Sequence, residues 1–227
     1  MIILISALVP VALIIIYIYI KDKYEKESKR DLAIAFFLGA FLSIIVTLIL
    51  SMFTQIILPL PDDYSIFQQF IKAFFVVALI EEFSKYIFVR FYSQPKKYFN
   101  EPFDGIVYAV MVSMGFAAIE NIAYVSQGGM GTAIVRAFTA VPAHATFAVL
   151  MGYFMGLAKF APSKKQKRKL NLIGLALAVL FHGAYDFFLF IGFIPGISIG
   201  AFVSLTIGII LSNKAIKRHQ ENSKFKL

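Results

Sequence analysis

Ionisable side chains inside otherwise apolar stretches are the residues of this sequence whose types and spacing point most directly to chemistry. They are Glu81, Glu82 and Lys85 in EEFSK, Glu120 and Asn121 in FAAIEN, the isolated His144, and His182 with Asp186 in HGAYD. An ionised side chain at the centre of a bilayer costs roughly 2.5–3.5 kcal/mol on an insertion scale, so several of them indicate a functional site. Lys72 and Arg136 are left out of this group because each is expected near a helix end, where a long side chain can reach the interface.

Carboxylates, imidazoles and an amide in one pocket suit hydrolysis by activated water. A glutamate can take the proton from water, and a histidine or asparagine can donate hydrogen bonds to the oxyanion. Glu81 and Lys85 are four residues apart in the favourable order, but one lysine cannot neutralise two adjacent glutamates. One carboxylate is therefore left without a partner on its own helix and is available as a general base or acid. His182 and Asp186 are also four apart, so the aspartate can orient the ring.

Two versions of this site and one different function stay open. The site is either free of metal or holds Zn²⁺ on Glu82, His144 and His182, and the metal would then activate the water. No H-E-x-x-H motif specifies the metal version, and the absence of Cys excludes thiolate nucleophiles and thiolate ligands. The alternative function is a proton-coupled transporter or channel that uses the same carboxylates as an ion path.

The elements that carry these residues are predicted to be membrane helices. Hydrophobic residues make up 59% of the 227-residue chain and charged residues only 15%, whereas soluble domains are usually about 45–50% apolar. This excess predicts an all-α, polytopic transmembrane bundle that forms a single integral membrane domain over residues 1–227, with the motif-bearing helices at about 65–190. Apolar stretches predict about seven spans, at residues 1–20, 32–58, 65–90, 103–126, 132–158, 171–190 and 197–212.

Lysine and arginine alternate between the predicted loops. The first, third and fifth loops and the C-terminal tail are basic, whereas the loops around Pro59, Gly129 and Pro195 contain no Lys or Arg. The positive-inside rule then predicts an N-terminus outside and a C-terminus in the cytoplasm. The formal net charge of +9 is explained by this topology, so the expected partner of the basic segments is the lipid bilayer and not nucleic acid.

Four ordered motifs resemble the PrsW family of membrane proteases, which is similar in turn to the CAAX-prenyl endopeptidase and bacteriocin-immunity superfamily. They are EEFSK (81–85), FDGIVYAVMVSMGFAAIENIAY (103–124), HATFAVLMGYFMG (144–156) and FHGAYDF (181–187). The resemblance implies a protease of the prokaryotic plasma membrane that cuts a membrane-anchored protein, namely an anti-sigma factor. It also implies that Glu81 and Glu82 are catalytic, that Lys85 tunes them, and that Phe116 with Glu120, His144, and His182 with Asp186 form the remaining motifs.

Overall fold

The computed structural model describes residues 2–60 and 65–226, and every regular element in these residues is helical. The all-helical prediction is confirmed. The elements are α1 (Ile2–Lys21), α2 (Lys29–Phe37), the π-helical η1 (Leu38–Ser43), α3 (Ile44–Ile57), α4 (Ile66–Ile71), the π-helical η2 (Lys72–Ala78), α5 (Leu79–Phe88), the π-helical η3 (Val89–Ser93), α6 (Phe103–Phe138), α7 (Ala140–Lys159), α8 (Lys164–Phe190) and α9 (Ile199–Glu221).

Five segments of the described residues are long and apolar enough to cross a membrane. They are Ile2–Lys21, Lys29–Ile57, Phe103–Lys159, Lys164–Phe190 and Ile199–Glu221. The third contains both α6 and α7. The predicted helix at 65–90 is present as α4 to η3, but its ionisable residues keep it outside this set. The count of seven spans stays a prediction.

Several helices extend beyond the apolar stretches that predicted them. α8 begins at Lys164, seven residues before the expected start at 171, because the Ser163 hydroxyl accepts a hydrogen bond from the Gln166 backbone N–H at 3.2 Å and caps the helix. Hydropathy detects only the apolar part of a helix, whereas backbone hydrogen bonds continue into its polar end.

The predicted loop at 127–131 is instead a kink within α6. Gly129 alone has a non-helical backbone, with φ 69° and ψ −160°, a left-handed φ that favours glycine. Helical geometry resumes after it and continues to Phe138, and Thr139 separates α6 from α7. The chain therefore bends at Gly129, which divides α6 into a first arm before this residue and a second, shorter arm after it. Arg136 in the second arm contacts Glu120 in the first.

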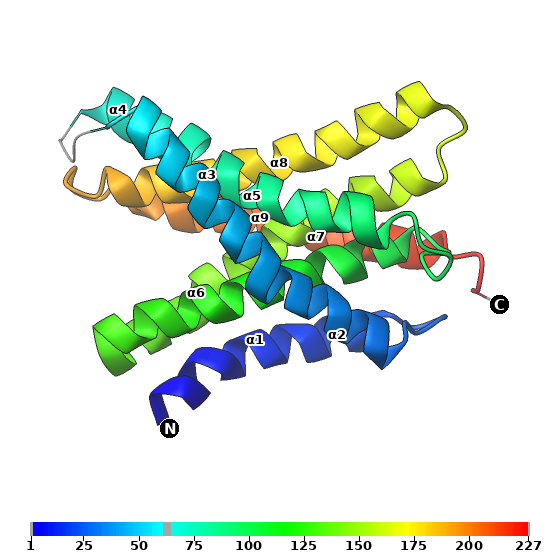
Figure 1. The fold of residues 1–227 in the computed structure, drawn as a ribbon. Helices are drawn as coiled ribbons and strands as arrows, with labels where there is room; N and C mark the ends of the chain where they lie inside the picture. Colours follow the sequence, from blue (N-terminus) through cyan, green and yellow to red (C-terminus); the bar gives the residue numbers. More distant parts are fainter. Residues whose placement is uncertain (1, 61–64, 227) are drawn as a thin grey trace.

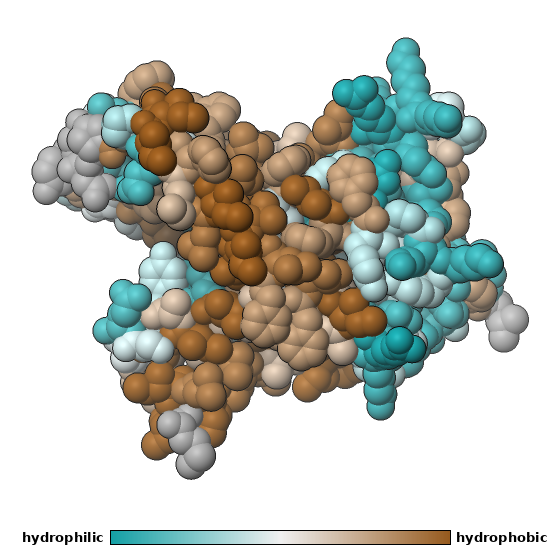
Figure 2. Space-filling view, in the orientation of Figure 1, coloured by the Kyte–Doolittle hydropathy of each residue, from teal (hydrophilic) through white to brown (hydrophobic). Residues whose placement is uncertain are grey.

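The four basic segments gather at one end of the bundle. In Figure 1 the end of α1, the connection before α6, the turn between α7 and α8, and the C-terminus all lie at the right. Figure 2 shows hydrophilic side chains at that end and hydrophobic side chains across the middle of the molecule. This arrangement agrees with the predicted alternation of loops, and the orientation of the two ends relative to the membrane stays a prediction.

The first half of α6 forms the buried centre of the bundle, with every residue from 103 to 118 buried. Glycines let α7 approach it closely. A Cβ atom added at Gly152 would lie 2.3 Å from the backbone oxygen of Gly105, and one added at Gly156 would lie 2.0 Å from that of Pro102. The G-x-x-x-G face of α7 therefore packs against another helix of the same chain.

Candidate active site

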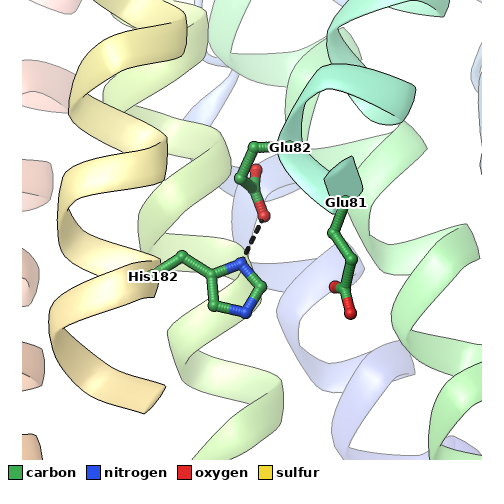
Figure 3. Close-up of side chains that lie close together, drawn as sticks. All are labelled: Glu81, Glu82 and His182. Carbon is green, nitrogen blue, oxygen red and sulfur yellow. Dashed lines mark hydrogen bonds and ion pairs between the residues drawn. The ribbon is translucent and has the colours of Figure 1, made fainter. Parts of the chain in front are cut away.

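The eight side chains predicted for the site come from α5, α6, α7 and α8, and the structure brings them into one connected group. Glu81 and Glu82 lie in the first turn of α5, directly after the π-helical η2. Figure 3 shows Glu82 reaching His182 on α8, with Glu81 beside them. A single polar layer therefore joins helices that are up to 100 residues apart in the sequence.

Lys85 is the centre of the first half of this group. Its Nζ lies 2.7 Å from Glu82 Oε1, 3.5 Å from Glu81 Oε2 and 3.4 Å from His144 Nδ1. The ammonium also lies 4.2 Å from the ring centroid of Phe116, within range of a cation–π contact. The Lys85 side chain is 2% exposed, so these groups replace the water it has lost.

His182 joins the α5 carboxylates to Asp186. Its Nδ1 lies 2.9 Å from Glu82 Oε1, and its Nε2 lies 3.2 Å from Asp186 Oδ2. The Phe147 ring stacks on the imidazole with centroids 4.9 Å apart. The ring is therefore held by a carboxylate at each nitrogen and by an aromatic face, which includes the contact that the four-residue spacing predicted.

Glu120 and His144 form the second half of the group, together with a residue that sequence reasoning missed. His144 Nε2 lies 2.7 Å from Glu120 Oε2, and Arg136 Nη2 lies 3.0 Å from the same oxygen. Arg136 Nε also donates to Asn121 Oδ1 at 2.7 Å, while Asn121 Nδ2 donates to the Ala7 backbone oxygen. Arg136 therefore belongs to this polar group, which the sequence prediction had left it out of. The available signal was the set of glycines at 128, 129 and 131, because α6 bends at Gly129 and Arg136 then faces Glu120.

A cavity of about 360 Å³ lies against this group. Its polar lining consists mainly of Glu81, Glu120, Arg136, His144, His182 and Asp186. Glu82 is 0% exposed and is not part of the lining. A second cavity of about 350 Å³, between α3 and η2, also reaches Glu81. Glu81 is thus the glutamate of the pair that meets open space, whereas Glu82 lies behind it.

Negative charge exceeds fixed positive charge in the cluster. Four carboxylates, those of Glu81, Glu82, Glu120 and Asp186, face the two permanent cations of Lys85 and Arg136. Ionised groups in so buried a setting need compensation. The balance must come from protonated imidazoles, from a shared proton or from a bound metal ion.

A metal ion fits part of this cluster, but not the set predicted from the sequence. Donor atoms of Glu81, Glu82 and His182 all lie within 4.8 Å of one another. Glu82 Oε2 is buried without a hydrogen-bond partner among the described residues. His144, predicted as a ligand with Glu82 and His182, is outside this trio because its two nitrogens face Lys85 and Glu120. Two carboxylates and one imidazole are a donor set that Zn²⁺ accepts.

Comparisons with known proteins agree on one family. The sequence model described as PrsW family intramembrane metalloprotease matches residues 27–212. A protein named Protease PrsW from Geobacillus kaustophilus is 39% identical over 187 residues, which cover 82% of this chain and 79% of that protein. Protease PrsW of Bacillus subtilis is 36% identical over 186 residues, 81% of each chain, and that of Clostridioides difficile is 33% identical over 190 residues, 82% of this chain and 78% of that protein. No solved structure matches the chain significantly.

Proposed function

Because this chain belongs to the PrsW family of intramembrane metalloproteases, we propose that it cleaves a membrane-anchored protein with water activated by Glu81. It is a multi-pass membrane protease. The observation that carries the mechanism is the unequal placement of the two glutamates. Glu81 lines the cavity, whereas Glu82 is buried between Lys85 and His182.

In this mechanism Glu81 acts as the general base. Its carboxylate takes a proton from water as the water oxygen adds to the scissile carbonyl carbon. The carbon–nitrogen bond then breaks, and the proton passes to the leaving amine. Glu82 holds Lys85 and His182 in place and keeps the positive charge of Lys85 next to the reacting group.

The oxyanion that forms on the carbonyl needs donors that already point into the cavity. Arg136 and His144 line the cavity and both contact Glu120. We assign oxyanion stabilisation to Arg136, whose guanidinium has further N–H donors besides those on Nε and Nη2 that bind Asn121 and Glu120, because preorganised donors in a water-poor site are effective. His144 has one nitrogen on Lys85 and the other on Glu120, so we assign it the role of positioning these two groups. Asn121 has its amide groups bonded to Arg136 and to the α1 backbone, so we assign it the role of positioning Arg136.

The family's metal would be held by Glu82 and His182, and Glu81, whose donor atom lies within 4.8 Å of theirs, would remain free to act as the base. Bound Zn²⁺ supplies Lewis acidity that polarises a carbonyl oxygen and a bound water. With the metal present, Glu82 Oε2 would gain the partner that it lacks among the described residues. Elemental analysis of purified protein tests this assignment. Stoichiometric zinc that falls in the His182→Gln variant supports it, while substoichiometric zinc with full turnover in chelator contradicts it.

We further propose one integral membrane domain with seven spans, N-terminus outside and C-terminus in the cytoplasm. The seven are α1, α2 to α3, α4 to η3, the first arm of α6, α7, α8 and α9. The collection of basic segments at one end of the bundle supports this topology. The cysteine of Lys165→Cys, in the exposed first turn of α8, should react with an impermeant maleimide only after the cells are opened. Labelling in intact cells would contradict the orientation.

The substrate we propose is a single-pass membrane protein, with an anti-sigma factor as the specific candidate. The cavity borders Val77, Phe147 and Phe202 besides its polar groups, and such mixed walls suit an unwound segment of a membrane helix. Quantitative proteomics of membranes that contain the native chain or Glu81→Gln should reveal a protein that is shortened only with the native chain. The anti-sigma assignment is contradicted if none of the shortened proteins is an anti-sigma factor.

Cleavage itself is tested with purified protein and a single-span substrate in detergent. Glu81→Gln should lower turnover by about 10²–10⁴-fold, the range for loss of a general base. Glu221→Gln is the matched control, because Glu221 is 54% exposed at the end of α9 and forms an exposed pair with Lys217 at 3.7 Å. Turnover that survives in both Glu81→Gln and Glu82→Gln contradicts the assignment.

A further inference from the structure

A second group of carboxylates lies at the basic end of the bundle, away from the active site. Glu25 and Glu27 belong to the connection between α1 and α2, and Asp104 is the second residue of α6. One oxygen from each of the three lies within 4.8 Å of the others. Asp104 and Glu120 are both on α6, 16 residues apart, which separates the two clusters by about 24 Å along the helix.

These carboxylates are buried and incompletely satisfied. Asp104 and the neighbouring Asp22 are 0% exposed, and Glu27 is 4% exposed. Asp22 Oδ1, Glu25 Oε2, Glu27 Oε1 and Asp104 Oδ1 are buried without a hydrogen-bond partner in the described part of the chain. Each such oxygen costs free energy unless something binds it.

In Asp104 and Glu27, the other carboxylate oxygen accepts hydrogen bonds. Asp104 Oδ2 accepts hydrogen bonds from the backbone N–H groups of Asn100 at 2.5 Å and Glu101 at 2.8 Å. The Tyr108 hydroxyl donates to Glu27 Oε2. One oxygen of each carboxylate is therefore held by hydrogen bonds, while the other has no partner among the described residues. Carboxylates that bind metal ions are commonly oriented by hydrogen bonds in this way.

Positive side chains do not neutralise the group. Within residues 2–60 and 65–226, no Lys or Arg forms an ion pair with Glu25, Glu27 or Asp104. The nearby Lys26 directs its ammonium to the Tyr19 backbone oxygen at 2.9 Å. The lysine closest in sequence thus forms no direct ion pair with the three carboxylates in the described residues.

We propose that Glu25, Glu27 and Asp104 bind a hard divalent cation of the Ca²⁺ and Mg²⁺ class, which fastens the α1–α2 connection to the start of α6. Both cations prefer oxygen ligands, and carboxylates dominate their protein sites. The group has no histidine or cysteine ligand, which distinguishes it from the Glu81, Glu82 and His182 set.

The chemical alternative to a cation is a proton. Burial raises the pKa of Asp22 to about 6 and that of Glu27 to about 7, with neighbouring carboxylates adding to the shift. Without a cation, the group can hold protons near neutrality. Cation binding would displace them, so a bound cation and a shared proton predict different behaviour.

Tb³⁺ luminescence of the full-length chain in detergent tests the site directly. The chain has no Trp, and the Tyr108 hydroxyl contacts Glu27, so Tb³⁺ bound here should emit when tyrosine is excited. Emission should saturate and be reversed by Ca²⁺ or Mg²⁺, and the cation that reverses it at the lower concentration is the preferred one. Emission that neither cation reverses, or no saturable emission, would overturn the site.

Variants separate this site from the active site and from folding defects. Glu25→Gln, at a partly exposed position, should weaken binding by about tenfold or more. Glu81→Gln should leave the Ca²⁺-reversible emission unchanged, and Glu221→Gln is the surface control. Ca²⁺ or Mg²⁺ should also raise the unfolding temperature of the native chain but not of Glu25→Gln. Equal emission and equal thermal shifts in the native chain and Glu25→Gln would mean that the cation binds elsewhere.

Discussion

Glu82→Gln should destabilise the protein far more than Glu81→Gln, although the two residues are adjacent. Glu82 Oε1 lies 2.7 Å from Lys85 Nζ and 2.9 Å from His182 Nδ1, and the Lys85 and Glu82 side chains are 2% and 1% exposed. Removing one partner of a buried ion pair costs about 3–5 kcal/mol because the other charge is left uncompensated. Glu81 remains 3.5 Å from Lys85, so we expect the lower end, about 3 kcal/mol.

Glu81→Gln removes much less. The Glu81 side chain is 14% exposed, lines the cavity and reaches Lys85 only at 3.5 Å, the outer limit of a hydrogen bond. Its loss should cost about 1 kcal/mol or less. For a chain of this size, about 2–4 °C of melting temperature accompanies each kcal/mol, so Glu82→Gln should melt about 6–12 °C lower and Glu81→Gln about 2–4 °C lower.

Thermal unfolding in one detergent, followed by far-ultraviolet circular dichroism, measures both variants, with Glu221→Gln as the surface control. The decisive quantity is the difference in melting temperature between Glu81→Gln and Glu82→Gln, because both variants carry the same type of substitution and are measured in the same detergent. If Glu82→Gln melts as high as Glu81→Gln, Glu82 is not the buried anchor of Lys85 and His182, and the division of roles between the glutamates is refuted.

Three further predictions concern other parts of the molecule. Arg136→Lys keeps the charge but loses the forked contact with Glu120 and Asn121, so kcat should fall by about tenfold or more while melting changes little; unchanged kcat means that Arg136 has no part in the reaction. Gly152→Val should destabilise the chain by several kcal/mol, roughly 3 or more, because its Cβ would meet backbone 2.3 Å away; native-like melting refutes the close α6–α7 packing. In chelator, the stability contributed by protonated Asp22 and Glu27 should be fully present below about pH 4 and be lost as pH rises through 6 to 7, since their raised pKa values favour the protonated folded forms; melting that rises between pH 6 and 7 contradicts the sign.

The sequence was sufficient to predict the helical class and the members of the polar cluster, for a clear physical reason. An ionisable residue in an apolar helix is costly wherever it faces lipid, so Glu81, His144 and His182 had to converge or pair. Arg136 was misjudged because its position depends on the single left-handed residue Gly129. The unequal placement of Glu81 at the cavity and Glu82 behind it was also beyond reach, since the π-helical η2 before them changes which helix face they occupy.

The carboxylate group at the start of α6 was missed for a different reason. Glu25 and Glu27 lie in a polar connection, where acidic side chains are ordinary, and Asp104 is an ordinary acidic residue in the first turn of a helix. Only the folded chain reveals that all three approach one another, because the connection after α1 meets the start of α6 about 80 residues later in the sequence.

Both polar clusters include α6, and this bears on how a bundle in lipid fixes the register of its central helix. The buried residues of α6 and α7 are mostly Gly, Ala, Val and Met, and packing of such residues resists separation but resists axial sliding less, because apolar surfaces offer similar contacts after a small shift. Directional polar contacts lack that tolerance. Tyr108, near one end of the buried half of α6, donates a hydrogen bond to Glu27 of the α1–α2 connection, and Glu120, at the other end, contacts His144 of α7. A shift of α6 by one residue, about 1.5 Å along the axis, would break both of these contacts together, so the carboxylates of Glu27 and Glu120, which are costly to bury, hold α6 at the depth where Glu120 meets the cavity.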